Sequence, residues 1–202
     1  MSDPSPGETA ILPALWRVPL EAALHRERDD PTSRYVQLAT IRPDGRPANR
    51  TVVFREFLYH TDRLQFAVDA RSDKVADLEK RRWAEVCWYF PIGREQFRIL
   101  GRVKLVGPEH RDEDLLAARV ALWQSLTGEV RAQYAWPEPG APRAGDAAFK
   151  LRHPDPRTPL DTFMLLLLSP VEIDHLRLGP MPPERQRYRL WPKGWVRESI
   201  NP

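Results

Sequence analysis

The stretch SRYVQLATIRPDGRPANRTVVFREF, residues 33–57, decides the fold. On either side of its centre, RPDGRP at 42–47, apolar and polar side chains alternate with a period of two, which predicts two β-strands. Asp44 and Gly45 stand at that centre, and glycine readily adopts the positive φ that a tight hairpin requires. The stretch therefore predicts an antiparallel β-hairpin.

Outward from this hairpin, the chain continues as short strands interrupted by helices. The patterns predict helices at 15–28, 72–82 and 108–127, and further strands at 63–69, 84–90, 94–106, 162–170, 171–178, 185–191 and 195–200. About seven to nine strands with hairpin connections favour a mainly β fold, an antiparallel β-barrel with peripheral α-helices. A Rossmann domain is not expected, because no GxGxxG follows a strand.

Three further segments carry expectations about the organisation of the chain. Residues 1–10 predict a disordered tail and residues 11–202 a single domain. The continuous apolar run Phe163–Leu168 predicts a strand that is buried on both faces. Residues 136–159 are rich in Pro, Gly, Ala and charge, and they predict a long loop that is ordered only when a ligand or a partner subunit holds it.

Composition excludes several classes of protein. The 202 residues carry 31 Lys and Arg against 28 Asp and Glu, and a net charge of +3 does not predict a nucleic-acid surface. No apolar run approaches the roughly 20 residues of a membrane span, and the polar start MSDPSPGET does not resemble a signal peptide. A single Cys excludes an intramolecular disulfide. We therefore expect a cytoplasmic protein without membrane or nucleic-acid partners.

The positive charge is nearly all guanidinium, since only five of the 31 basic residues are lysines. Arginine suits bidentate binding of phosphate, although a GC-rich genome would give the same excess. In RTVVFR, Arg50 and Arg55 stand on opposite faces of the second strand among apolar residues. Each needs an anion or a carboxylate there, so they are either ligand-binding arginines or ordinary surface and ion-paired ones.

Two other short motifs fit binding of a phosphorylated heterocycle. Ser72 precedes a helix, and the free N–H groups of its first turn, with Arg71 and Lys74, predict a phosphate site. Solvated cap residues would give the same pattern. Gln96 offers a donor and an acceptor that suit the edge of a heterocycle, or alternatively a cross-strand hydrogen bond.

Metal binding and nucleophilic catalysis find little support. The five histidines show no paired ligand spacing, no GxSxG occurs, and Cys87 lies in an apolar strand where a buried, inert thiol is expected. No catalytic residue is identified, so any reaction needs a cofactor.

In order and separation, RTVVFR at 50–55, SDK at 72–74 and REQFRILG at 94–101 resemble the pyridoxamine 5′-phosphate oxidase superfamily, the FMN-binding split barrels. The similarity extends from about residue 15 to the ending RYRLWPKGWVRESINP. It implies a split β-barrel and a homodimer with FMN at the subunit interface.

The resemblance also implies site residues. The FMN-binding set comprises Arg50, Thr51, Val52, Val53, Phe54, Arg55, Arg71, Ser72, Lys74, Gln96 and Arg187. Within this set, Gln96 is expected to reach the flavin from the partner subunit. Arg55 is also expected to contact the substrate, together with Arg131.

Several positions depart from the family pattern. Asp73 stands where the family has an arginine, for which Arg71 is the expected substitute, and Leu176 stands near an expected tryptophan. The Arg-Leu-His element with which the family grips pyridoxal phosphate is absent from 178–187. These departures concern the substrate more than the cofactor.

The function implied is that of an FMN-dependent oxidoreductase acting on a small molecule, with pyridoxamine or pyridoxine 5′-phosphate as the default substrate. Two alternatives stay open. One is a flavin-binding or flavin-sensing module without turnover, and the other is a split-barrel protein that uses haem or a deazaflavin.

Overall fold

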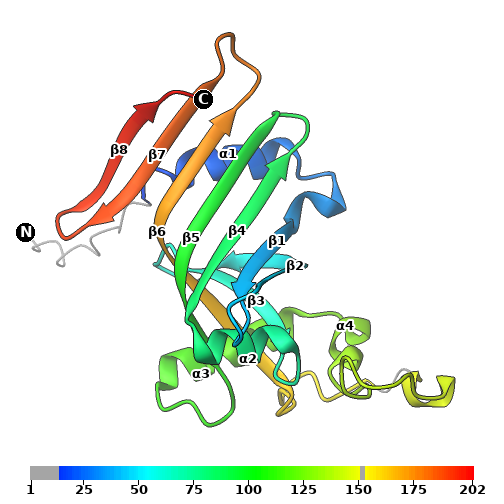
Figure 1. Ribbon diagram of the computed structural model, residues 1–202. Coiled ribbons are helices and arrows are strands. Elements are labelled where there is room, and N and C mark those ends of the chain that lie inside the picture. The colour runs from blue at the N-terminus through cyan, green and yellow to red at the C-terminus, as the bar shows by residue number, and fades with distance from the viewer. Residues whose placement is uncertain (1–13, 151–152) are drawn as a thin grey trace, which may run out of the picture.

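The computed structural model describes residues 14–150 and 153–202 (Figure 1). Its strands are β1 (Tyr35–Ile41), β2 (Pro47–Phe57), β3 (Leu64–Asp69), β4 (Trp83–Phe90), β5 (Glu95–Val106), β6 (Phe163–Arg177), β7 (Glu184–Trp191) and β8 (Gly194–Ile200). Its helices are α1 (Arg17–Arg26), α2 (Asp73–Lys80), α3 (Glu113–Ser125) and α4 (Gly128–Gln133), with 3-10 helices η1 (Pro31–Arg34) and η2 (Asp146–Phe149). The tail predicted at 1–10 lies outside the described residues.

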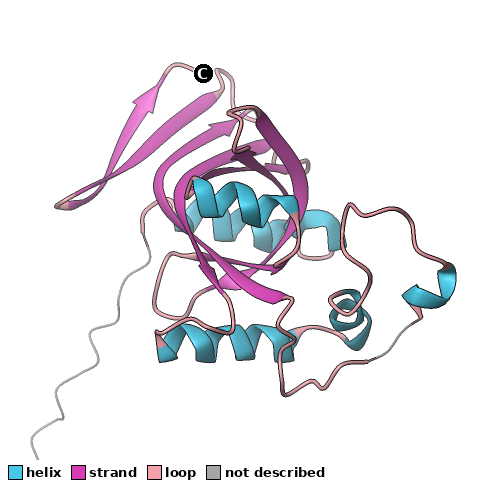
Figure 2. Cartoon of the chain, turned by 60° about the horizontal axis from the view of Figure 1, so that its bottom comes forward, coloured by secondary structure: helices cyan, strands magenta, loops and turns pink. Residues whose placement is uncertain are grey.

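The strands form a closed barrel with an added hairpin. Their order is β3-β2-β1-β4-β5-β6-β7-β8, all neighbours are antiparallel, and β3 also pairs with β6. This extra pairing closes the first six strands of that order into the barrel seen in Figure 2, whereas β7 and β8 continue beyond it (Figure 1). The predicted antiparallel barrel with peripheral helices is confirmed.

The β1–β2 hairpin has the predicted turn. The two strands pair from Tyr35 opposite Val53 to Ile41 opposite Pro47. Gly45 has a φ of 90°, and the Arg46 amide donates to Asp44 Oδ1 at 3.0 Å. The sequence pattern therefore located both strands and the turn between them.

Strand β6 is one continuous strand of 15 residues, so the prediction of two strands divided after Pro170 was wrong. Pro170 lies opposite Gly101, where the ladder with β5 shifts register. A proline is tolerated at such a bulge, because the ladder is already interrupted there. A Cβ atom on Gly101 would lie 2.5 Å from the carbonyl oxygen of Ser169, which explains the glycine at this close approach.

The apolar run 163–168 is buried on both faces, as predicted, because two cores meet at it. Leu166 and Leu168 belong to the core inside the barrel. Leu165 and Leu167 belong to a second core beneath α3. The first half of β6 therefore separates the barrel interior from the helical layer.

The helical segments differ in detail from the expected ones. Helix α3 begins at Glu113 rather than near Pro108, because Asp112 Oδ1 accepts a hydrogen bond from the Leu115 amide at 3.1 Å and caps the helix. Helix α4 was not predicted, and η2 interrupts the expected loop 136–159. Within the described ranges, no helix is long and apolar enough to cross a membrane.

An ion pair between exposed Arg26 and buried Glu95 fastens α1 to the barrel. Glu95, 4% exposed, accepts from Arg26 at 2.6 Å and lies 2.9 Å from Nε2 of His175. Burial alone would raise the pKa of Glu95, but the hydrogen bonds from Arg26 and His175 outweigh it and lower that pKa. Burial lowers the pKa of His175 by more than Glu95 raises it.

Acid should therefore weaken the fold. The folded-state pKa of Glu95 lies below its ordinary 4.5. The charged carboxylate therefore stabilises the fold above pH 4.5, and this stabilisation is lost as the pH falls through the lowered pKa. The folded-state pKa of His175 lies below 6.5, so the unfolded chain binds the proton first and stability falls as the pH drops below 6.5.

Thermal unfolding followed by circular dichroism from about pH 7.5 to about pH 4 should show this falling Tm. His175→Gln should flatten the fall at its upper end, whereas His153→Gln, at an exposed histidine, should keep the wild-type slope. Equal slopes in the two variants would contradict this account.

Candidate functional site

A cavity of about 590 Å³ lies between strands β2 and β3 and the chain segment that includes α4 and η2. This volume is within the usual range for small-molecule sites. The strands contribute Thr51, Val52, Val53 and Arg55 from β2 and Ala67, Val68 and Asp69 from β3. The opposite wall includes Tyr134, Trp136 and Phe149, and Lys74 closes one end.

Strand β2 divides its side chains between cavity and core. Val52 and Phe54 are 9% and 2% exposed, and Phe54 packs inside the barrel. Thr51, Val53 and Arg55 alternate with them and line the cavity. The Arg55 guanidinium forms no hydrogen bond with the described residues, and its Nε atom is buried without a partner. Arg55 is therefore a cation available to a ligand.

The end of the cavity at α2 has the features of an anion site. Ser72 occupies the N-cap position, yet its hydroxyl donates to the Asp69 carbonyl at 2.6 Å instead of accepting from the helix. The first amides of α2, at Asp73 and Lys74, have no intrahelical acceptor. Lys74 Nζ donates to Ser72 Oγ at 2.8 Å and has no carboxylate partner among the described residues. Burial and the charge of Arg50 lower the pKa of Lys74.

Arg50 lies beside this end, held by groups of the protein itself. It donates to Thr40 Oγ1 at 2.6 Å, to the Leu38 carbonyl at 3.2 Å and to Asp77 Oδ2 at 3.2 Å. Asp77 is 3% exposed and also accepts from the Thr40 hydroxyl at 2.7 Å. Arg50 therefore adds positive charge next to Lys74 but does not line the cavity. Its predicted contact with the flavin stays a prediction.

Arg71 and Arg131 form hydrogen bonds with other groups of the protein and do not line the cavity. Arg71 binds Asp69 through two hydrogen bonds of 3.0 and 2.7 Å and donates to the carbonyls of Trp136 at 2.8 Å and Tyr134 at 3.3 Å. It thus ties the far wall of the cavity to the turn before α2. Arg131 donates to the Leu126 carbonyl at the end of α3 and does not line the cavity. Since neither Arg71 nor Arg131 lines the cavity, their predicted contacts with the cofactor and the substrate stay predictions.

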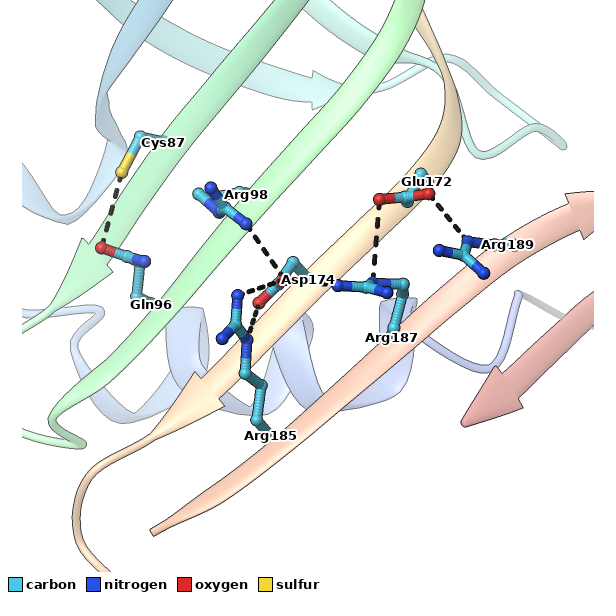
Figure 3. Close-up of polar contacts among 8 residues, drawn as sticks. All are labelled: Cys87, Gln96, Arg98, Glu172, Asp174, Arg185, Arg187 and Arg189. Carbon is cyan, nitrogen blue, oxygen red and sulfur yellow. Dashed lines mark hydrogen bonds and ion pairs between the residues drawn. The ribbon is translucent and has the colours of Figure 1, made fainter. Parts of the chain in front are cut away.

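Gln96 and Arg187 lie away from the cavity, on the sheet face formed by β4, β5, β6 and β7 (Figure 3). Arg98 donates to Asp174 at 3.0 Å, and Arg185 donates to the same carboxylate through two hydrogen bonds of 2.9 and 2.8 Å. Arg189 donates to Glu172 at 2.9 Å. Arg187 lies 3.9 Å from each of these carboxylates and has a buried Nε without a partner. It is the most loosely paired arginine in Figure 3.

The same face carries Cys87, whose sulfur lies 3.8 Å from Gln96 Oε1. The thiol is half-buried, so the expectation of a buried one was wrong. Burial and the neighbouring Glu85 carboxylate raise its pKa, which keeps it protonated and unreactive as expected. Leu176, which stands near the position of the expected tryptophan, pairs with Gln96 across the ladder between β5 and β6.

The aromatic wall of the cavity was missed by sequence reasoning. The rings of Trp136 and Phe149 meet edge to face with centroids 5.8 Å apart, and the Arg143 guanidinium lies 4.2 Å from the Phe149 centroid. Burial raises the pKa of Tyr134, so its hydroxyl stays neutral. The only sequence signal was the position of Tyr134 and Trp136 before, and of Phe149 after, a Pro-rich stretch.

A closed six-stranded antiparallel barrel with a cavity beside its second strand is the architecture of the split β-barrels. A family model described as "Pyridoxamine 5'-phosphate oxidase, FMN-binding domain" matches residues 13–107. This range includes Lys74 and Gln96 but neither Arg131 nor Arg187.

Individual relatives extend the match to nearly the whole chain. Pyridoxine/pyridoxamine 5′-phosphate oxidase 2 of Arabidopsis thaliana is 36% identical over 199 residues, covering 94% of this chain and 98% of the relative. The crystal structure of a pyridoxamine 5′-phosphate oxidase-related, FMN-binding protein from Nostoc punctiforme is 47% identical, with a TM-score of 0.91 and coverage of 94% and 98%. The chain belongs to the pyridoxamine 5′-phosphate oxidase family.

A more distant structure has the same fold. PhzG from Burkholderia lata, solved in complex with tetrahydrophenazine-1-carboxylic acid, is 21% identical and has a TM-score of 0.76 over 94% of both chains.

The hydrogen bonds of Arg71 to the Trp136 and Tyr134 carbonyls should hold the far wall of the cavity in place. Replacing Arg71 with Gln removes its charged hydrogen bonds to Asp69 and the loop carbonyls, each worth about 1.5–3 kcal/mol. Amides of residues 134–149 should then exchange with deuterium at least about tenfold faster. Arg46→Gln, which breaks an exposed ion pair with Asp44, is the control and should leave these amides unchanged. Unchanged exchange in Arg71→Gln would show that the loop is held by other contacts.

Proposed function

We propose that this chain is a homodimeric, cytoplasmic FMN-dependent oxidoreductase that acts on a small molecule. The observation that carries the proposal is Lys74, a half-buried cation that lacks a carboxylate partner among the described residues and stands at the start of α2 beside the cavity. An unneutralised ammonium next to free helix amides favours a phosphate there.

The residues present fit FMN. The Ser72 hydroxyl, Lys74 and the first amides of α2 would hold its phosphate, with Arg50 adding positive charge behind them. The Thr51–Val53 segment of β2 would lie along the isoalloxazine ring. When bound, FMN supplies two-electron redox chemistry that side chains do not provide. The wall at Tyr134 and Trp136 would exclude water, and Arg55 would orient the substrate.

The position of the remaining predicted ligands supports the proposed dimer. Gln96 and Arg187 lie on the sheet face of Figure 3, outside the cavity lining. We therefore propose that Gln96 and Arg187 of the partner subunit complete each flavin site. The loose pairing of Arg187 supports this role, because a buried guanidinium nitrogen without an acceptor needs one.

FMN binding tests the cofactor. Lys74→Gln removes one charge-assisted hydrogen bond and should weaken FMN binding by about 10–100-fold in a titration of flavin fluorescence. Lys80→Gln, at the exposed other end of α2, is the matched control and should bind like the wild type. Equal affinities for both variants would remove the basis for the proposed phosphate site. A bound haem or deazaflavin would be recognised from its absorption spectrum.

Mixed dimers test the shared site. If a chain carrying Lys74→Gln is co-expressed with a chain carrying Arg187→Gln and the dimer is purified through two different tags, one site contains both lesions and the other contains neither. The mixed dimer should bind about half the wild-type amount of FMN with wild-type affinity. If both residues served a site within one chain, every site would be damaged and this recovery would be absent.

Turnover is tested with the compounds that the relatives' names suggest. Under anaerobic conditions, pyridoxamine 5′-phosphate or pyridoxine 5′-phosphate should bleach the absorbance of the flavin-loaded protein, and air should restore it. Flavin that stays oxidised with both compounds would favour the alternative of a flavin-binding module without turnover.

A further inference from the structure

One buried carboxylate on the sheet face of Figure 3 lies among three arginines. The Oδ2 atom of Asp174, on β6, lies 3.0 Å from Arg98, 2.8 Å from Arg185 and 3.9 Å from Arg187. Burial alone would raise the pKa of Asp174, but the hydrogen bonds from Arg185 and Arg98 outweigh it and lower that pKa. The carboxylate is therefore charged at neutral pH, and one negative charge stands among three positive ones.

The other carboxylate of this face does not remove the excess. Glu172 lies 2.9 Å from Arg189 and 3.9 Å from Arg187. Among the described residues, the four arginines of Figure 3 thus have two carboxylates within ion-pair distance. Even with Arg187 assigned to the flavin, Arg98 and Arg185 still share the single charge of Asp174. An anion that reached them would supply the missing counter-charge.

The guanidinium groups of this pair are held in place and stay accessible. The side chains of Arg98 and Arg185 are 42% and 27% exposed, while Asp174 lies buried between them. Asp174 accepts two hydrogen bonds from Arg185 and one from Arg98. Since a guanidinium has five N–H donors, most donors of the two arginines remain open. Guanidinium groups arranged in this way suit a phosphate, which accepts several charge-assisted hydrogen bonds at once.

The place of the pair in the sheet indicates which phosphate it would meet. Arg98 stands two residues after Gln96 on β5, and Arg185 stands two residues before Arg187 on β7, so each shares a face with its neighbour. We have placed Gln96 and Arg187 at the flavin of the partner subunit. In that arrangement the FMN phosphate is held at Lys74 of the other chain, so Arg98 and Arg185 would meet a second anion beside the flavin.

Resting on the proposed function, we infer that Arg98 and Arg185 of the partner subunit bind the phosphate group of a phosphorylated substrate. The substrate would then lie between two chains, with Arg55 contacting it from the chain that holds the flavin. A phosphate ester carries about −1.5 to −2 at neutral pH and would compensate the positive charge that the pair and Arg55 leave unbalanced.

Two unreactive ligands that differ only in a phosphate test this inference. 4-Deoxypyridoxine and its 5′-phosphate share one ring and lack the amine or alcohol that would be oxidised. Each is titrated into full-length protein saturated with FMN, and binding is followed by the change in the flavin spectrum. The phosphate ester should bind more than about tenfold more tightly to the wild type. Absence of this preference in FMN-loaded protein would overturn the inference alone, whereas wild-type protein that binds no FMN would overturn the proposed function as well.

Variants on β5 test the assignment of Arg98. Arg98→Gln should weaken binding of the phosphate ester by about 10–100-fold and change binding of the unphosphorylated ring by less than about twofold. Arg98→Lys should restore part of the affinity for the ester, and Arg102→Gln, at an exposed arginine of the same strand, should bind both ligands like the wild type. Equal losses for both ligands would indicate a merely structural role, and loss of FMN itself would assign Arg98 to the cofactor. Either result would overturn the inference.

A mixed dimer tests whether the contact crosses the interface. When one chain carries Arg98→Gln and the other carries Lys74→Gln, limiting FMN should fill the cavity of the chain whose Lys74 is intact. That cavity faces an intact Arg98 of the partner subunit, so it should bind the phosphate ester with wild-type affinity. Binding as weak as in the Arg98→Gln homodimer would place Arg98 at the flavin of its own chain and contradict the inference.

Discussion

Strand β6 pairs with β5 through residues 165–177 and with β3 through residues 163–168, and this double pairing closes the barrel. The rest of the structure depends on it. The same six residues separate the two hydrophobic cores, so losing the pairing would expose apolar side chains on both faces of the strand. Beyond Pro170 the strand leaves β3 and pairs with β7, which is why β7 and β8 extend outside the barrel.

Closure also fixes the position of the cavity. The last pair of the β3–β6 ladder joins Asp69 to Phe163, and the next amide, of Ala70, donates to the Thr162 carbonyl at 2.8 Å. The turn that leads to Lys74 therefore starts directly from the ladder that closes the barrel. From the same turn, Arg71 holds the aromatic wall, so the anion end and the far wall share one anchor. Rigid support of this kind keeps binding groups in place before a ligand arrives.

Local patterns in the sequence predicted most of the fold. Alternating apolar residues located the strands, and Gly45 marked the hairpin turn, because both signals act between near neighbours in the chain. The continuity of β6 through Pro170 could not be predicted, since it depends on a bulge opposite Gly101 in another strand. Of the candidate site, the motifs located the β2 wall and Lys74. The actual partners of Arg71 and Arg131 were missed, because backbone carbonyls of a distant loop and of a helix end leave no trace in composition.

The arginines show why a count of charges says less than their pairing. Two of the four arginines predicted to bind the cofactor are already paired with a carboxylate of the same chain, Arg50 with Asp77 and Arg71 with Asp69. What distinguishes a binding group is a cation whose counter-charge is missing, and Lys74 and Arg55 meet this criterion in the cavity while Arg187 approaches it on the sheet face. A partly buried charge without a counter-charge costs stability. This chain carries such cations on two separate surfaces, the cavity and the sheet face of Figure 3. An anion held between two copies of the chain would compensate the cations of both surfaces.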